Sequence, residues 1–141
     1  MKETAPAPLA FLMLGTVHEM EARLESSLGQ AGLSLAKFGV LARLAEAGEP
    51  LALGSLAERC SCVRSNMTQL VDRLEADKLV ERIDDPNDRR SIKAALTPEG
   101  RSRYEEGVRL LDDAERDAFA RLADPDRDLL SRLLRMLREN P

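Results

Sequence analysis

Apolar residues recur every three or four positions along most of the chain, the spacing that places side chains on one face of an α-helix. After Pro8 the spacing continues to Leu28 and predicts a first helix that ends at Gly29. The spacing returns in later stretches. It predicts helices over residues 8–28, 34–48, 53–60, 63–77, 97–122 and 124–137.

Helix-capping residues mark several of these boundaries. Ser34 can cap the second helix at its N-terminus, and Gly48 can close it. The run Thr97-Pro98-Glu99 combines a cap, a first-turn proline and an acid near the positive end of a helix. We therefore expect a helix to begin there.

Two stretches alternate between apolar and polar residues instead. Leu79–Asp84 and Ser91–Leu96 are predicted strands, and the sequence between them, Asp-Pro-Asn-Asp-Arg-Arg, is a charged turn. Pro50–Leu53 is predicted to be a short extended link. The order α-α-α-α-β-β-α-α predicts a mainly α protein with a small β-hairpin.

Composition limits the class of protein. The 141 residues are 43% hydrophobic and contain no Trp, which fits one compact module with an aliphatic core. The longest N-terminal apolar run, Leu9–Leu14, is too short for a signal peptide or a membrane span. We expect a cytoplasmic protein without membrane association, and therefore reduced cysteines.

Charge is spread unevenly along the chain. The net charge is −4 overall, with −3 in residues 1–58, +1 in residues 59–93 and −2 in residues 94–141. Although 33% of the residues are charged, the stretch from Cys60 to Val71 has no Asp or Glu. Its polar side chains are Arg64, Ser65, Asn66, Thr68 and Gln69, together with the two cysteines and Ser61.

This acid-free stretch has the chemistry of a DNA-recognition helix. With Met67 facing inward, the polar side chains and Arg73 lie on the outer faces of the helix. Amides can bond adenine, Arg can bond guanine, and a helix N-terminus favours phosphate. A carboxylate there would be repelled by phosphates. A solvated polar face on an ordinary helix is the alternative that periodicity alone leaves open.

The neighbouring elements support the DNA interpretation. A short helix, a tight turn and the acid-free helix form a helix-turn-helix. The hairpin that follows, tipped by Arg89 and Arg90, makes a wing that can reach an adjacent minor groove or phosphates. The sequence thus predicts a winged helix-turn-helix.

Residues 56–101 resemble the winged-helix core of the multiple-antibiotic-resistance regulator (MarR) family. The specific part of the resemblance is D-P-N-D-R-R at 85–90 followed by L-T-P-E-G at 96–100. It implies an obligate homodimer on a pseudo-palindromic operator, usually a repressor relieved by a small ligand or by oxidation. It also implies an N-terminal dimerisation helix (1–32), a DNA-binding lobe (33–97) and C-terminal dimerisation helices (98–141).

The resemblance assigns roles to single residues. Base contacts map to Arg64, Ser65, Asn66, Gln69 and Arg73, with Thr68 on the flank of the same helix. Wing contacts map to Arg89 and Arg90, and Asp88 is expected to hold an arginine in position.

The chain departs from the family pattern around the turn. Cys60–Val63 stand where Leu-Gly-Val-Ser is common, and Ala52 stands where Thr or Ser often caps the third helix. Val63 cannot cap the recognition helix as Ser would, which costs about 1 kcal/mol unless Ser61 substitutes.

The two cysteines allow a structural and a chemical interpretation. Cys60 continues the apolar face of the third helix, so it is expected to belong to the core. Cys62 lies at a helix N-terminus beside Arg64, and both features lower a thiol pKa. Its oxidation would distort the recognition helix and release DNA.

The only histidine, His18, is expected on the surface or in a dimer interface, with a ligand contact as the alternative. Two cysteines and one distant histidine do not make a zinc site, and we expect no metal or other cofactor.

Two rival functions remain beside DNA regulation. The first is a winged-helix protein-interaction module that never touches DNA. The second is a small thiol enzyme using Cys62, which lacks a base because His18 lies on another helix. We expect no catalytic activity.

Overall fold

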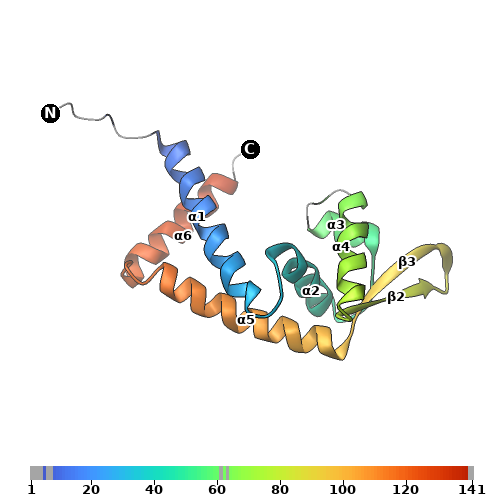
Figure 1. Ribbon diagram of the computed structural model, residues 1–141. Coiled ribbons are helices and arrows are strands. Elements are labelled where there is room, and N and C mark those ends of the chain that lie inside the picture. Colours follow the sequence, from blue (N-terminus) through green and yellow to red (C-terminus); the bar gives the residue numbers. More distant parts are fainter. Residues whose placement is uncertain (1–4, 6–7, 61, 63, 140–141) are drawn as a thin grey trace.

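The computed structural model describes residues 5, 8–60, 62 and 64–139, which form six helices and three strands (Figure 1). Elements follow the predicted order, with one strand added. They are α1 (Leu9–Gly29), α2 (Leu35–Ala47), β1 (Leu51–Ala52), α3 (Leu53–Arg59), α4 (Arg64–Ala76), β2 (Val80–Asp85), β3 (Asp88–Leu96), α5 (Pro98–Ala118) and α6 (Asp124–Arg138).

The predicted caps are confirmed. The Ser34 hydroxyl accepts a hydrogen bond from the Lys37 backbone amide at 3.1 Å, and Gly48 closes α2 with a left-handed φ of 66°. The Thr97 hydroxyl accepts from the Gly100 amide at 2.9 Å and donates to the Lys78 carbonyl at 2.8 Å. Thr97 therefore joins the start of α5 to the start of the hairpin.

Other boundaries differ from the expected ones. Pro8 is the residue before α1 and not part of its first turn. Ala52 precedes α3 without a side-chain cap, in agreement with the missing Thr or Ser noted in the sequence. The link expected at residues 50–53 contains strand β1, in which Leu51 and Ala52 pair with Ala94 and Lys93 of β3. The sheet is antiparallel in the order β1-β3-β2, so the backbone of the link has strand partners that a local pattern does not reveal.

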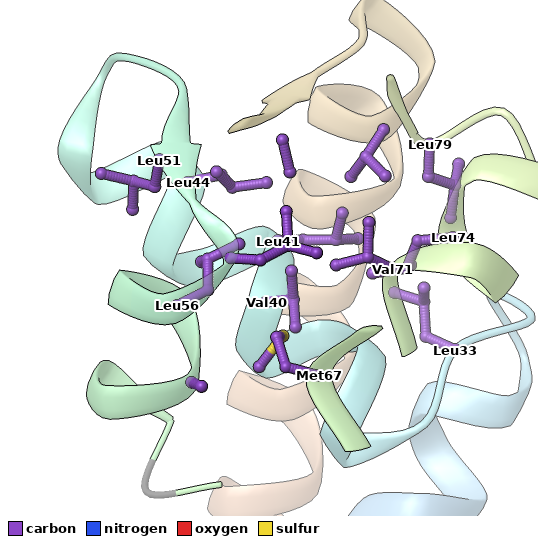
Figure 2. Packing of buried hydrophobic residues seen from close by; sticks show 14 of the residues in the cluster. Leu33, Val40, Leu41, Leu44, Leu51, Leu56, Met67, Val71, Leu74 and Leu79 are labelled. Atoms are coloured by element: carbon purple, nitrogen blue, oxygen red, sulfur yellow. The ribbon is translucent and has the colours of Figure 1, made fainter. Parts of the chain in front are cut away.

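The hydrophobic core lies within the part of the chain from the end of α1 to β3. Figure 2 shows Leu41 of α2, Leu56 of α3 and Met67 of α4 converging on it. These three side chains are completely buried. The core thus fixes α4 against α2 and α3 and determines which face of α4 stays in water.

Helix α5 approaches the rest of the fold closely at two glycines. A Cβ on Gly100 would lie 2.0 Å from the Leu79 carbonyl oxygen, and one on Gly107 would lie 2.8 Å from the Phe38 ring. Real Cβ atoms essentially never lie closer than 3.0 Å to such a neighbouring heavy atom, so a side chain at either position would force a shift. Both positions therefore need glycine for the helix to pack at this distance.

Helices α1 and α6 leave much apolar surface in water. None of the residues of α6, all of which the structure describes, is buried. Both helices lie at the end of the molecule away from the hairpin (Figure 1). The exposed large apolar side chains there are Leu9, Phe11, Leu12, Met13, Leu14, Val17, Leu129, Leu133, Leu134, Met136 and Leu137.

Candidate nucleic-acid interface

Helix α4 separates an apolar face from a polar face. Met67, Val71 and Leu74 are 0% exposed and belong to the core. The side chains expected on the outer faces are exposed: Ser65, Asn66, Thr68, Gln69 and Arg73. Arg64 is the first residue of the helix. The predicted inward and outward faces of this helix are therefore confirmed.

The acids that follow the polar stretch are all paired with cations. Asp72 accepts a hydrogen bond from the Arg82 guanidinium, and Glu75 accepts another from it at 3.0 Å. Asp77 forms an ion pair with Lys37 of α2 at 2.9 Å. Each of these carboxylates thus has a cationic partner, and the exposed side chains that the structure describes in the first turns of α4 are polar and uncharged.

Arg82 was not singled out from the sequence. It lies on β2, on the same side of the strand as the buried Val80, and this side faces α4. The Glu75 carboxylate also accepts the Arg82 backbone amide at 3.1 Å. The hydrogen bond to Asp72 is the largest cause that raises the pKa of Arg82, which therefore stays charged. The sequence carried a signal for this contact. Val80 and Arg82 are two residues apart and therefore lie on one side of a strand, and Asp72 and Glu75 are three residues apart and therefore lie on one face of a helix.

The hairpin projects from the helices beside α4 (Figure 1). Arg89 and Arg90, near its tip, are both exposed. The Asp88 carboxylate accepts the Arg90 backbone amide at 3.0 Å, and the Asp85 carboxylate accepts the Asn87 amide at 2.9 Å. Asp88 therefore fixes the backbone that carries Arg90.

Two carboxylates thus shape the tip of the wing. The β2–β3 register also shifts between Asp84 and Asp85, which bends the hairpin next to its turn. Lys93 lies 3.8 Å from the Asp85 carboxylate and balances part of its charge. The exposed arginines are held on a backbone that local hydrogen bonds order.

The turn between α3 and α4 is described only in part. Cys60 and Cys62 are half-buried, are not joined by a disulfide and pack against the hydrophobic core. Burial raises the pKa of the Cys60 thiol, and the nearby Arg43 guanidinium opposes this without cancelling it. The capping question at Ser61 and Val63 lies outside the described residues.

The remaining candidates are placed as follows. His18 is exposed on α1 in the single chain, so its role as a ligand contact stays a prediction. Among the described residues, no group of three or more His, Cys, Asp or Glu side chains is placed to hold a metal ion. Within the same part of the chain, no helix has the length and apolar character needed to cross a bilayer.

Comparison with known proteins places the chain beside bacterial regulators. A sequence profile of the MarR family matches residues 31–91. The HTH-type transcriptional regulator YsmB of Bacillus subtilis is 32% identical over 99 residues, which cover 70% of this chain and 67% of YsmB. The HTH-type transcriptional repressor MdtR of the same organism is 34% identical over 88 residues, which cover 62% of this chain and 56% of MdtR.

Solved structures share the whole fold. BpsR of Bordetella bronchiseptica, whose DNA binding is regulated by 6-hydroxynicotinic acid, has a TM-score of 0.83 at 24% identity, with 100% of both chains covered. A cysteine-to-serine mutant of MarR from E. coli, complexed with operator DNA, has a TM-score of 0.82 at 24% identity, with 93% of this chain and 94% of that chain covered. At 24% identity, the likeness establishes the winged-helix fold of this chain. The operator DNA and 6-hydroxynicotinic acid are ligands of those two proteins.

Proposed function

Because the chain belongs to the MarR family of HTH-type transcriptional regulators, we propose that it is a homodimer that binds a specific duplex DNA sequence and represses transcription. Members of this family are regulators and not enzymes. The proposed operator is pseudo-palindromic, because a two-fold dimer presents the same helix twice. The proposed location is the cytoplasm, where bacterial DNA lies.

The observation that carries the proposal is the outer surface of α4. Its first turns expose hydroxyl and amide groups without a carboxylate, and its later acids are paired with Arg82 and Lys37. A helix with this surface can enter the major groove without repelling the phosphates. The chain as a whole has a net charge of −4, so this acid-free stretch departs from its average composition.

Each group has a proposed partner on the duplex. The amides of Asn66 and Gln69 are suited to adenine. Arg64 and Arg73 are suited to guanine or phosphate, and the Ser65 hydroxyl can bond either adenine or guanine. Thr68 lies on the flank of this surface and is proposed to contact a base or the backbone. Arg89 and Arg90 are proposed to contact phosphates or an adjacent minor groove.

The dimer is proposed to form through the exposed apolar surface of α1 and α6. So many exposed large apolar side chains on two helices are uncommon on monomeric proteins. The corresponding division is an N-terminal dimerisation helix (1–32), a DNA-binding lobe (33–97) and C-terminal dimerisation helices (98–141). Two recognition helices about one DNA turn apart, roughly 34–36 Å, would then read two half-sites.

Repression and its relief are proposed from relatives. MdtR is named as a repressor, and BpsR responds to 6-hydroxynicotinic acid. A small-molecule effector or oxidation at Cys62 would change the spacing of the two recognition helices and so lower DNA affinity. His18 on α1 is a candidate contact for such a molecule.

The test is selection of bound duplexes from a random DNA pool by the full-length protein. We expect enrichment of a two-fold related sequence. Affinity for it should fall by about 10³–10⁵ between 50 and 200 mM salt if 6–10 phosphates are contacted. The rival interaction module would yield no enriched sequence and weak binding that is insensitive to salt, and this result would refute the proposal.

A further inference from the structure

A pocket of about 320 Å³ lies between α2 and the turn that joins α3 to α4. It is distinct from the exposed face of α4, because it touches that helix on the side of the buried Met67. An apolar cavity of about 150 Å³ already holds benzene. The pocket is therefore large enough for a small cyclic organic molecule.

The lining combines apolar groups with thiols and guanidinium groups. Leu35, Ala36, Gly39 and Leu70 supply apolar walls, and Met67 lies beneath them. Arg43, Arg59, Cys60 and Cys62 supply the polar groups, and none of the described lining residues carries a carboxylate. Such a lining suits an apolar molecule that carries an electron-rich oxygen and an electrophilic carbon.

Arg43 is placed to act on Cys60. A hydrogen bond and the positive charge of Arg43 both lower the pKa of the Cys60 thiol, against the larger effect of burial, which raises it. The Arg43 side chain is itself held by Glu46 at 3.1 Å, on the same helix. The Cys60 thiol is therefore mostly protonated at neutral pH and reacts slowly with dilute polar reagents. When the thiolate does form, the Arg43 guanidinium lies close enough to stabilise it.

We propose that this pocket is a covalent modification site, in which an apolar α,β-unsaturated carbonyl compound binds and alkylates Cys60. The effect on transcription rests on the proposed function, because it requires that α4 contacts DNA. The addition itself does not.

The reaction needs no oxidant or second reactant. The Cys60 thiol loses its proton to water, and the sulfur lone pair forms a C–S bond to the β-carbon of the bound molecule. The carbon–carbon π electrons move to the carbonyl oxygen, where Arg43 can stabilise the resulting enolate. Protonation of the α-carbon from water completes a thioether, so no net proton or electron is gained or lost.

Binding in the pocket makes the slow thiol reactive. A molecule held against Cys60 reacts as if at high effective concentration. The rate should therefore saturate with reagent concentration for a compound that fits, and rise linearly for a small polar reagent.

The adduct would act directly on the recognition helix. Cys60 follows the last turn of α3 and packs against the core that also holds α4. A permanent substituent between α2 and this turn adds volume to a packed region, and overpacking of this kind moves the backbone. The start of α4 would shift, and the DNA contacts of its first turns would weaken.

The first experiment measures alkylation of the full-length protein without DNA. The probes are N-phenylmaleimide, which has an apolar ring and an α,β-unsaturated carbonyl, and iodoacetamide, which is small and polar. Peptide mass spectrometry reports which cysteine is modified. We expect saturable kinetics at Cys60 with N-phenylmaleimide and linear kinetics with iodoacetamide. Linear kinetics with both probes, or modification of Cys62 alone, would overturn the proposal.

Variants separate the pocket from general thiol reactivity. Arg43→Gln should slow the addition at Cys60 several-fold, because the variant loses the positive charge and the hydrogen bond that favour the Cys60 thiolate. Arg101→Gln, an exposed arginine on α5, is the matched control and should leave the rate unchanged. If Arg43→Gln is alkylated at Cys60 at the same rate as the wild-type protein, the role assigned to Arg43 is wrong. Thermal melts of both variants check that the fold is retained.

The second experiment adds the selected DNA duplex. Alkylated protein should bind it at least about tenfold more weakly, which corresponds to about 1.4 kcal/mol. Cys60→Ala should bind equally well before and after treatment with N-phenylmaleimide, and Cys62→Ser should still respond. Unchanged binding by a protein fully modified at Cys60 would refute the regulatory part. If the protein binds no DNA before alkylation, the proposed function is refuted. The alkylation kinetics still test whether the pocket is a covalent modification site.

Discussion

Gln69 and Arg89 illustrate two kinds of side chain on the proposed DNA surface. Gln69 lies on the exposed face of α4 and carries a donor and an acceptor that can match one base edge. Arg89 lies near the tip of the hairpin and carries a charge that any phosphate satisfies. The two should therefore affect specificity differently.

Gln69→Ala should weaken binding to the selected operator by roughly 1–3 kcal/mol and barely change binding to random DNA. Arg89→Ala should weaken binding to both by similar factors and reduce the salt dependence by about one phosphate. Fluorescence anisotropy at two salt concentrations measures both. Equal losses on specific and random DNA for Gln69→Ala would contradict its assignment as a base contact.

Gly100 shows how one backbone position sets the placement of α5. Because an added Cβ would meet the Leu79 carbonyl oxygen at 2.0 Å, Gly100→Ala must push α5 away from the base of the hairpin. We expect a loss of about 1–3 kcal/mol in the free energy of unfolding, the usual cost of overpacking. Urea denaturation measures it. Gly54→Ala, where an added Cβ meets nothing within 4 Å, is the control and should cost nothing.

At the scale of elements, Arg82 couples the hairpin to the recognition helix. Its guanidinium binds Asp72 and Glu75 of α4, so the wing and the helix are held as one unit. The same contacts offset part of the negative charge of two carboxylates near the proposed DNA surface. Exposed ion pairs contribute only about 0–1 kcal/mol to stability, so the larger effect of this network is expected on binding.

Arg82→Gln should therefore lower DNA affinity by more than it lowers the free energy of unfolding. Freed carboxylates near phosphates are repulsive, and adding Asp72→Asn and Glu75→Gln to the variant should restore part of the affinity. Anisotropy and urea denaturation on the same samples make the comparison. Arg116→Gln, which breaks an exposed ion pair with Asp113 on α5, is the control. An Arg82→Gln protein that binds DNA normally would show that the coupling is only structural.

At the scale of the whole molecule, the chain has two ends with different surfaces. The hairpin end exposes the polar and cationic groups of α4 and the wing, while the other end exposes the apolar side chains of α1 and α6 (Figure 1). Leu133 and Leu137 of α6 are 45% and 60% exposed in the single chain. Because each is already partly buried, burying its remaining exposed surface in a dimer would contribute about half of the roughly 1.5–3 kcal/mol of a complete burial.

Leu133→Glu should accordingly shift the protein from dimer towards monomer at micromolar concentration and weaken operator binding. Sedimentation velocity measures the first effect and anisotropy the second. Ser131→Glu places the same charge at an exposed polar position of α6 and should preserve the dimer. A wild-type protein that sediments as a monomer at this concentration would refute the dimeric proposal itself.

The sequence by itself determined the elements and the face of α4 that meets solvent. Helical spacing repeats within a few residues, and caps such as Ser34 and Thr97 act on amides three residues away. Both can therefore be recognised from the sequence alone. The acid-free stretch was equally local. The specific motifs at 85–90 and 96–100 then led from these elements to the family.

Only the tertiary structure decided which distant groups meet. The pairing of β1 with β3, the contacts of Arg82 with Asp72 and Glu75, and the placement of Arg43 beside Cys60 each join different elements. No local period encodes such pairs, because their geometry depends on how the core packs the helices and the sheet. The sequence thus predicted the exposed face of α4 that we propose contacts DNA, and folding determined what supports that face and the pocket behind it.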